Sequence, residues 1–258
     1  MPRRILTAAA SLLTLLFLLA GTVLPACAAQ PAANAKALLN TVSLQPTKTG
    51  FGPTDDLVSK VLASVLKPDM DNYQKVKACY DYLLKDYKYG TSPASSDYAL
   101  YVFDFPGPVY AYDVLQGKQG VCDDYASAFA ALTRAIGFNT YVVGGQARRS
   151  DGTYSNHAWA VIKIGGTEYL FDPQIEGANA QRNGSVSYNW FCKTYAEKTG
   201  YRGGKTTDYF KPLDQMTAAD RARTVSTAEA NRRKGQNTYR VVNPDGSVST
   251  YTVHVQTA

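Results

Sequence analysis

One cysteine, one histidine and one aspartate near the middle of the chain have types and positions that suit nucleophilic catalysis. Cys122 stands early in "GVCDDYASAFAALTRAIG", a segment with helical periodicity, while His157 stands in "NHAWAVIKI" and Asp172 in "YLFDP". The thiolate is the nucleophilic form of a cysteine, and a helix N-terminus or a nearby imidazolium favours that form. An imidazole can transfer the proton, and a carboxylate on its second nitrogen fixes its tautomer. The three residues therefore predict a thiol nucleophile, a general base and an orienting acid.

The cysteine count singles out Cys122. The chain has four cysteines, of which Cys27 falls within a segment typical of an export signal. The other three cannot all pair within one chain, so an exported protein would keep at least one free thiol. Cys79 and Cys192 lie among aromatic residues in segments expected to be helical, and they either pair with each other or stay in the core. Cys122 is then the thiol left over.

The N-terminal segment predicts export. Two arginines precede an apolar run over residues 5–24, and "ACA" at 26–28 supplies the small residues that a signal peptidase accepts. We expect residues 1–28 to be a cleaved signal. The alternatives are an uncleaved membrane anchor and a lipoprotein signal that leaves a lipid on Cys27. All three place the rest of the chain outside the cytoplasm, as a secreted or cell-surface protein.

The composition excludes several classes of function. The chain is 45% hydrophobic and 19% charged, as in an ordinary globular protein, and its formal charge is +6. Residues 201–258 carry nine Lys/Arg and five Asp/Glu, which suits either a solvated face or contact with an anionic wall polymer or membrane surface. No nucleic-acid-binding motif is recognisable, and the cysteines lack metal-ligand spacing. We therefore expect no nucleic acid partner, no metal and no cofactor.

Hydrophobic periodicity predicts the elements that must position the three side chains. We expect a helix from Asp55, capped by Thr54, that stops before Pro68, and further helices over 71–88, 121–136 and 190–199. Strands are expected over "NTYVVGG", "HAWAVIKI" and "TEYLFD", and the last twenty residues predict a hairpin around "NPDG". The excursion over 89–120 forms either a wall or lid beside a site or an ordinary packed loop.

These elements divide the chain into four expected parts. Residues 1–28 are the signal, and residues 29–54, rich in Ala, Thr, Gln and Pro, are a flexible leader. Residues 55–210 form the main domain. Residues 211–258 are a basic C-terminal extension that ends in the hairpin.

A two-residue turn at 165–166 fixes which residues of the last two strands of the domain face each other. Asp172 then faces Trp159, and His157 becomes a diagonal neighbour of Asp172 on the same face of the sheet. Diagonal neighbours lie about 7–8 Å apart, which an imidazole–carboxylate hydrogen bond can span. The same register places Gln174 opposite His157.

The same segments resemble a known family, the transglutaminase-like superfamily. "GVCDDYASAFAALTRAIGFNTYVVGG", "NHAWAVIKI" and "YLFDPQ" are similar to its three signature segments, and the resemblance covers roughly residues 70–176. Cys122, His157 and Asp172 fall on the family's papain-like Cys-His-Asp triad. The resemblance implies an α+β fold, in which a helical layer that carries Cys122 packs on an antiparallel sheet that carries His157 and Asp172.

The resemblance also implies an activity. It describes an exported thiol enzyme that acts on peptide or protein amide bonds, some of them associated with the cell wall, through an acyl-enzyme and without a cofactor. Water as the acceptor makes the protein a cysteine peptidase or amidase, which exported bacterial members resemble more often. A lysine amine makes it a protein-glutamine transglutaminase that forms isopeptide cross-links. The remaining interpretation is an inactive binding module of the cell surface.

The residues around the triad are less clearly assigned. In this family a side chain upstream of the cysteine often helps to bind the oxyanion, and the candidates beside the backbone N–H of Cys122 are Tyr112, Gln116 and Gln119. Trp159 is interpreted as a packing residue and, alternatively, as a substrate contact. Asp123 and Asp124 are expected to serve the helix N-terminus, with contact to a substrate cation as the alternative.

Overall fold

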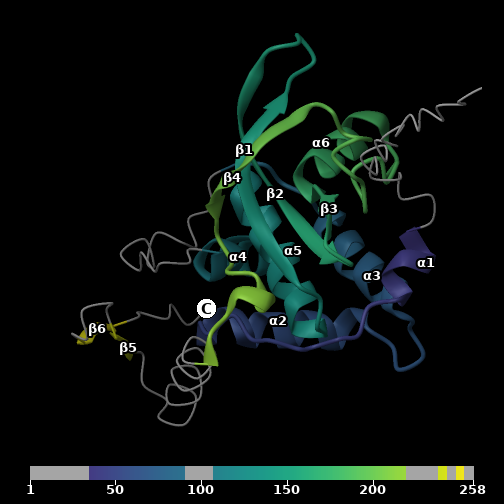
Figure 1. Ribbon diagram of the computed structural model, residues 1–258. Helices are drawn as coiled ribbons and strands as arrows, with labels where there is room; N and C mark the ends of the chain where they lie inside the picture. Colours follow the sequence, from purple (N-terminus) through teal and green to yellow (C-terminus); the bar gives the residue numbers. More distant parts are fainter. Residues whose placement is uncertain (1–34, 91–106, 219–237, 243–247, 253–258) are drawn as a thin grey trace, which may run out of the picture. The chain divides into compact units, whose positions relative to one another are not determined.

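The computed structural model describes residues 35–90, 107–218, 238–242 and 248–252 (Figure 1). The helices are α1 (Ala35–Asn40), α2 (Gly52–Val65), α3 (Asn72–Leu84), α4 (Gly107–Gly117), α5 (Cys122–Ile136), α6 (Pro173–Asn183) and the 3-10 helix η1 (Leu213–Gln215). The strands are β1 (Thr140–Arg148), β2 (Tyr154–Ile164), β3 (Thr167–Phe171), β4 (Tyr201–Asp208), β5 (Thr238–Val242) and β6 (Val248–Thr252).

A four-stranded antiparallel sheet forms the centre of the domain. Its strand order is β3-β2-β1-β4, so β4 returns to the edge of the sheet opposite β3. The turn between β2 and β3 consists of Gly165 and Gly166, whose φ angles are +56° and +83°. Glycine adopts this left-handed backbone without the steric cost that a Cβ imposes, which is why the predicted two-residue turn forms. β4 contains a register shift against β1 between Gly144 and Gln146.

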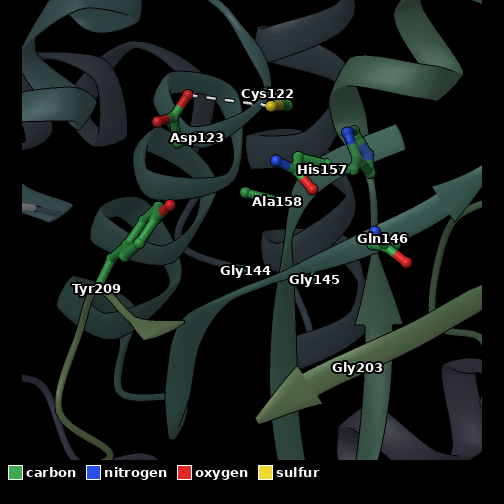
Figure 2. A pocket seen from close by; sticks show the side chains of 10 residues that line it. Cys122, Asp123, Gly144, Gly145, Gln146, His157, Ala158, Gly203 and Tyr209 are labelled. Carbon is green, nitrogen blue, oxygen red and sulfur yellow. Dashed lines mark hydrogen bonds between the residues drawn. The ribbon is translucent and has the colours of Figure 1, made fainter. Parts of the chain in front are cut away.

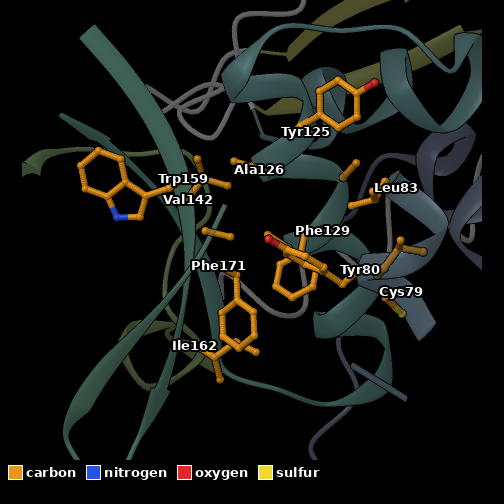
Figure 3. Close-up of a cluster of buried hydrophobic side chains, with 14 of the residues drawn as sticks. Cys79, Tyr80, Leu83, Tyr125, Ala126, Phe129, Val142, Trp159, Ile162 and Phe171 are labelled. Carbon is orange, nitrogen blue, oxygen red and sulfur yellow. The ribbon is translucent and has the colours of Figure 1, made fainter. Parts of the chain in front are cut away.

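Helix α5 packs on β1 and β2 and is also covered by α2, α3 and α4 (Figure 1). Nearly every residue of α5 is therefore buried, although the sequence pattern predicts one apolar face only. Most side chains outside that face are small, and alanines allow neighbouring elements to approach closely. Arg134 is the large exception, and its buried guanidinium donates to the Thr140 and Lys211 carbonyls. Figure 3 shows the core in which Tyr80 of α3, Phe129 of α5 and Phe171 of β3 meet.

The expected flexible leader is wrong for residues 35–54. α1 places Leu39 in the core, where it is fully buried, and Phe51 is 2% exposed. The segment between α1 and α2 runs beside the end of α5, because the Gln45 N–H donates to the Gly137 carbonyl over 2.8 Å. Thr54 is also no cap: it lies inside α2, and its hydroxyl donates to the Pro108 carbonyl over 2.6 Å.

The predicted helix over 190–199 is wrong as well. This segment consists of turns and one isolated bridge, in which Lys193 pairs with Leu170 at the edge of β3. Cys192 adopts a positive φ of +55°, which a helix does not allow. The segment takes this form because Phe191 and Cys192 point into the core while the Lys193 backbone bonds to the strand.

The α+β fold class predicted from the sequence is confirmed: helices pack on an antiparallel sheet. The C-terminal hairpin is also confirmed, as β5 pairs with β6. The predicted signal at 1–28 lies outside the described residues, as do 91–106 of the excursion and most of the extension. Within the described residues, no helix is both long enough and apolar enough to span a bilayer.

Candidate active site

The start of helix α5 is fixed by contacts on both sides of Cys122. Gly120 accepts a hydrogen bond from the Gly90 N–H over 3.1 Å, which ties the residues before the helix to the segment after α3. A Cβ at Gly120 would lie 2.6 Å from a valine methyl of α4, so only glycine fits at this approach. Asp124 caps the helix by accepting the Val121 N–H over 2.8 Å. Cys122 is therefore the first residue of α5, which begins one residue later than the predicted start at 121.

The predicted register of β2 and β3 brings His157 and Asp172 together. The two strands pair from Ile164↔Thr167 to Ala160↔Phe171, which is the register that the glycine turn predicts. His157 Nε2 and Asp172 Oδ2 are 2.6 Å apart. The diagonal contact inferred from the sequence is therefore confirmed.

Asp172 has a second role, because it also starts a helix. Its Oδ1 accepts the Ile175 N–H over 2.9 Å, and Pro173 follows as the first residue of α6. β3 consequently ends at Phe171, and the prediction that Gln174 faces His157 on a strand is wrong. Gln174 lies in α6, where its Nε2 donates to the Tyr87 hydroxyl over 2.9 Å.

Two tyrosines that the sequence analysis did not single out complete the environment of Asp172. The Tyr201 hydroxyl, from β4, donates to Asp172 Oδ2 over 2.6 Å. The Tyr80 hydroxyl, from α3, donates to the Asp172 carbonyl over 3.0 Å. Burial, followed by the negative charge of Asp172, raises the pKa of Tyr201, so its hydroxyl stays protonated and donates. The carboxylate, which is fully buried, thus accepts hydrogen bonds from an imidazole, a phenol and a helix N-terminus.

The charge state of His157 is set by competing effects. Burial alone lowers the pKa of this imidazole, but the charge of Asp172, its hydrogen bond and the hydrogen bond with Cys122 raise the pKa to about 10. Since Nε2 faces Asp172, Nδ1 is the ring nitrogen that remains for the sulfur. His157 therefore stands between a carboxylate on one nitrogen and the thiol on the other, and it favours the protonated state.

A cavity of about 530 Å³ opens at the sulfur (Figure 2). In this view the Cys122 sulfur lies between the Asp123 carboxylate and the His157 ring. The described residues that line the cavity come from the start of α5, from β1 and β2, and from the end of the sheet at β4. They are Cys122, Asp123, Gly144, Gly145, Gln146, Asn156, His157, Ala158, Gly203 and Tyr209, the last of which follows β4. Of the three predicted triad residues, Cys122 and His157 line the cavity, whereas Asp172 is fully buried and contacts His157 Nε2.

The predicted contacts outside the triad are not part of this wall. Tyr112, Gln116, Gln119 and Trp159 are absent from the described lining of the cavity, and Gln116 is exposed on α4. Trp159 is fully buried, and its indole N–H donates to the Tyr195 hydroxyl over 2.9 Å, which favours the packing interpretation. Gln146, Asn156 and Tyr209 were not predicted from the sequence, because only the pairing of β1 with β2 and β4 brings them to the cavity.

The cysteines differ in accessibility. Cys79, Cys122 and Cys192 are free thiols, so Cys79 and Cys192 do not pair. Cys79 is fully buried and Cys192 is 1% exposed, and burial raises the pKa of both thiols. Cys122 alone of these three reaches the cavity. Among the described residues, no three His, Cys, Asp or Glu side chains form a group that could hold a metal ion.

Comparison with solved structures finds weak overall similarity. A proposed cysteine protease from Cytophaga hutchinsonii is 20% identical, with a TM-score of 0.37, and the match covers 66% of this chain and 55% of that one. A TGase is 21% identical, with a TM-score of 0.32, over 46% of this chain and 31% of that one. Arylamine N-acetyltransferase C from Bacillus anthracis is 11% identical, with a TM-score of 0.35, over 79% of this chain and 93% of that one. The match therefore spans about half of the first of these structures and about a third of the second. No curated protein matches the sequence.

The family comparison is more specific. The family model described as "Transglutaminase-like superfamily" matches residues 59–173, a range that begins in α2 and ends one residue after Asp172. It includes the helix that begins with Cys122 and both strands that position His157 and Asp172. Residues 59–173 of this chain therefore match a transglutaminase-like superfamily domain.

Proposed function

We propose that this domain is a cysteine peptidase or amidase that cleaves peptide or protein amide bonds through an acyl-enzyme on Cys122. One observation carries the proposal: His157 is bonded to the buried Asp172 at 2.6 Å, and it lines the same open cavity as the Cys122 thiol. A nucleophile, a base and a group that orients the base are the parts that covalent acyl transfer requires.

In the proposed reaction the imidazole first takes the thiol proton, and the sulfur attacks the amide carbonyl carbon. The tetrahedral intermediate collapses as the C–N bond breaks, and His157 returns its proton to the leaving amine. A thioester to Cys122 remains. A water molecule then attacks this thioester while His157 accepts its proton. The C–S bond breaks as His157 passes that proton to the sulfur, which releases a carboxylic acid and the free thiol. No cofactor enters this sequence.

The surroundings support the roles assigned to each residue. Asp172 is fixed by Tyr201 and by the N-terminus of α6, so it holds the ring of His157 in one orientation. Gln146 and Asn156 add amide groups to the cavity wall, where N–H donors can stabilise a negative oxygen in the transition state.

We also propose that the protein acts outside the cytoplasm. The apolar N-terminal segment with small residues at 26–28 is the basis for this proposal, with export by a cleaved signal favoured over an anchor or a lipid on Cys27. The proposed domain bounds, 55–210, extend beyond the family match because β4 supplies Tyr201. The substrate would then be an extracellular or cell-wall peptide.

The test compares the wild type with Cys122→Ala on an extracellular protein mixture, analysed by mass spectrometry for new peptide termini and new isopeptide links. Hydrolysis predicts new termini that the wild type produces and the alanine variant does not. Isopeptide links that depend on Cys122 would replace the proposal with transamidation. Termini that persist with Cys122→Ala, or no product from the wild type on any tested mixture, would contradict it and favour the binding-module interpretation.

A further inference from the structure

A carboxylate that the triad does not use lies next to the nucleophile. Asp123 lines the cavity, and its Oδ1 is 3.9 Å from the Cys122 sulfur, which donates to it (Figure 2). Its neighbour Asp124 already caps α5 by accepting the Val121 N–H. Asp123 also accepts backbone N–H groups at the start of α5, but its carboxylate lies at the cavity wall, beside a sulfur that must become negative.

Tyrosines surround this carboxylate. Tyr209 lines the same cavity, and in Figure 2 its hydroxyl end points toward Asp123. Tyr110 of α4 packs edge-on against the Tyr209 ring, with the ring centres 5.5 Å apart. Burial and then the charge of Asp123 raise the pKa of both phenols, to about 12 for Tyr209. A carboxylate next to neutral phenol rings, whose faces carry the negative part of the ring quadrupole, is a suitable environment for a cation.

The position of Tyr209 is fixed by its backbone. Its N–H donates to the Val142 carbonyl of β1 over 3.1 Å, and its carbonyl accepts the Gly107 N–H, at the start of α4, over 3.1 Å. This side chain is therefore held between the sheet and α4. The pair formed by Asp123 and Tyr209 is a built part of the wall, because the two residues come from different elements that are each hydrogen-bonded in place.

The charges at the cavity are not balanced by the described side chains. The ion pairs of the described residues join Lys36 to Asp71, Lys77 to Asp81, Lys163 to Asp214, Lys193 to Glu197 and His157 to Asp172. None of them includes Asp123. We consider the sum of the formal charges on four side chains: Cys122, His157, Asp172 and Asp123. Transfer of a proton from the thiol to His157 leaves this sum unchanged. Burial raises the pKa of Asp123, because its carboxylate loses solvation at the cavity wall. A cation beside this carboxylate would favour the ionised form, in which the sum is negative.

We propose that Asp123 and Tyr209 form a subsite for a cationic group of the substrate, such as a lysine-type ammonium, next to the amide bond that Cys122 attacks. The proposal deepens the proposed function by naming the substrate class. Ion pairing with a carboxylate keeps an amine protonated and therefore non-nucleophilic. The cation is thus a recognition element and not the acyl acceptor. Its arrival also offsets the repulsion between Asp123 and the developing thiolate.

The test uses three thiol reagents of similar size and different charge on the full chain. These are 2-aminoethyl methanethiosulfonate, the uncharged methyl methanethiosulfonate and 2-sulfonatoethyl methanethiosulfonate, and each forms a disulfide with Cys122. Peptide mass spectrometry gives the rate constant at Cys122, with Cys122→Ala as the background. The cation-to-anion ratio is the rate constant of the cationic reagent divided by that of the anionic reagent. We expect this ratio to be about tenfold larger in the folded wild type than in the same chain unfolded in urea.

Variants locate the source of this preference. Asp123→Asn should reduce the cation-to-anion ratio by about tenfold, whereas Asp56→Asn, the same change at an exposed carboxylate of α2, should leave the ratio within about twofold of the wild type. Tyr209→Leu should reduce the ratio by about threefold, and Tyr209→Phe, which keeps the ring, should retain most of it. Circular dichroism checks that each variant is folded, and the comparison of folded with unfolded wild type needs no variant.

Three results would overturn the subsite: a folded wild type that prefers the anionic reagent, a ratio equal to that of the unfolded chain, and a ratio that Asp123→Asn leaves unchanged. A positively charged His157 that acts without Asp123 would make the folded wild type prefer the anionic reagent. Failure of the proposed hydrolase is a separate outcome, because it appears as absent product from peptides while the charge ratio at Cys122 is still measured. A cation preference with no cleavage would support the subsite and reject the hydrolase.

Discussion

The two halves of the candidate site are built differently. On the acid half, Asp172 and His157 are almost fully buried, with side chains that are 1% and 7% exposed, and each is bonded to partners from other elements. On the thiol half, Cys122 and Asp123 face an open cavity, and Cys122 is only partly buried. The difference suggests that the two halves have different roles. The acid half fixes the orientation of one imidazole, while the thiol half leaves room for a substrate.

The comparison predicts the largest loss of activity for a substitution on the acid half. Asp172→Asn can still cap α6 through its amide oxygen, but its NH₂ would face His157 Nε2 and force the proton onto Nδ1. That tautomer cannot accept the thiol proton, so we expect cleavage of a peptide identified in the proteomic test to fall by about 10²–10⁴-fold. Steady-state kinetics measures this loss. A matched change at the exposed Asp214 should have little effect on cleavage, and an Asp172→Asn variant within threefold of the wild type would remove the orienting role.

A smaller effect is expected from the partner that β4 contributes. Tyr201→Phe removes the hydroxyl that donates to Asp172 Oδ2 but keeps the ring. Because a hydrogen bond to a buried charge is lost, we expect unfolding free energy to fall by about 1–3 kcal/mol. kcat should fall by about tenfold, the loss expected if transition-state stabilisation worth about 1.4 kcal/mol is removed, while KM stays within twofold.

The control for Tyr201 is Tyr195→Phe. The Tyr195 hydroxyl accepts from the Trp159 indole over 2.9 Å, away from Asp172, so the same atom is removed without touching the triad. This variant should change stability but not kcat. Equal losses of kcat in the two variants would show that Tyr201 acts only through general packing and would contradict its positioning role.

The smallest effect is a difference in the pH dependence of stability. The pKa of His157 is raised from 6.5 to about 10 in the folded chain, so its protonation favours folding. This contribution is complete below pH 6.5 and is lost as the pH rises through 10. Urea unfolding at pH 6.5 and at pH 10 should therefore show a larger loss of unfolding free energy for the wild type than for His157→Gln. Parallel losses in both proteins would contradict the charged His157–Asp172 pair.

The sequence predicts the acid half well because short-range rules determine it. The turn at Gly165 and Gly166 sets the register of two adjacent strands, and that register alone brings His157 beside Asp172. The start of α5 at Cys122 follows in the same way from the helical pattern and from Gly120. Both features depend on residues within a few positions of each other along the chain.

The remaining contacts could not be predicted, because they depend on tertiary packing. Tyr201 lies 29 residues from Asp172, beyond a segment of turns without periodicity. That segment is held by the buried Glu176, whose carboxylate accepts the backbone N–H groups of Ser187, Tyr188 and Trp190. The expected helix at 190–199 fails for the same reason. Tyr209 reaches the cavity only because the chain crosses from β4 toward α4.

The most direct measurement of the central claim is the rate at which iodoacetamide alkylates Cys122 at pH 6, in the wild type and in His157→Ala. At this pH a free cysteine is mostly protonated and reacts slowly. If His157 takes the thiol proton, the wild type should react at least about tenfold faster than the variant, and Asp172→Asn should lie between them. Equal rates in the wild type and in His157→Ala, both matching a free cysteine, would contradict the assignment of Cys122, His157 and Asp172 as one catalytic unit.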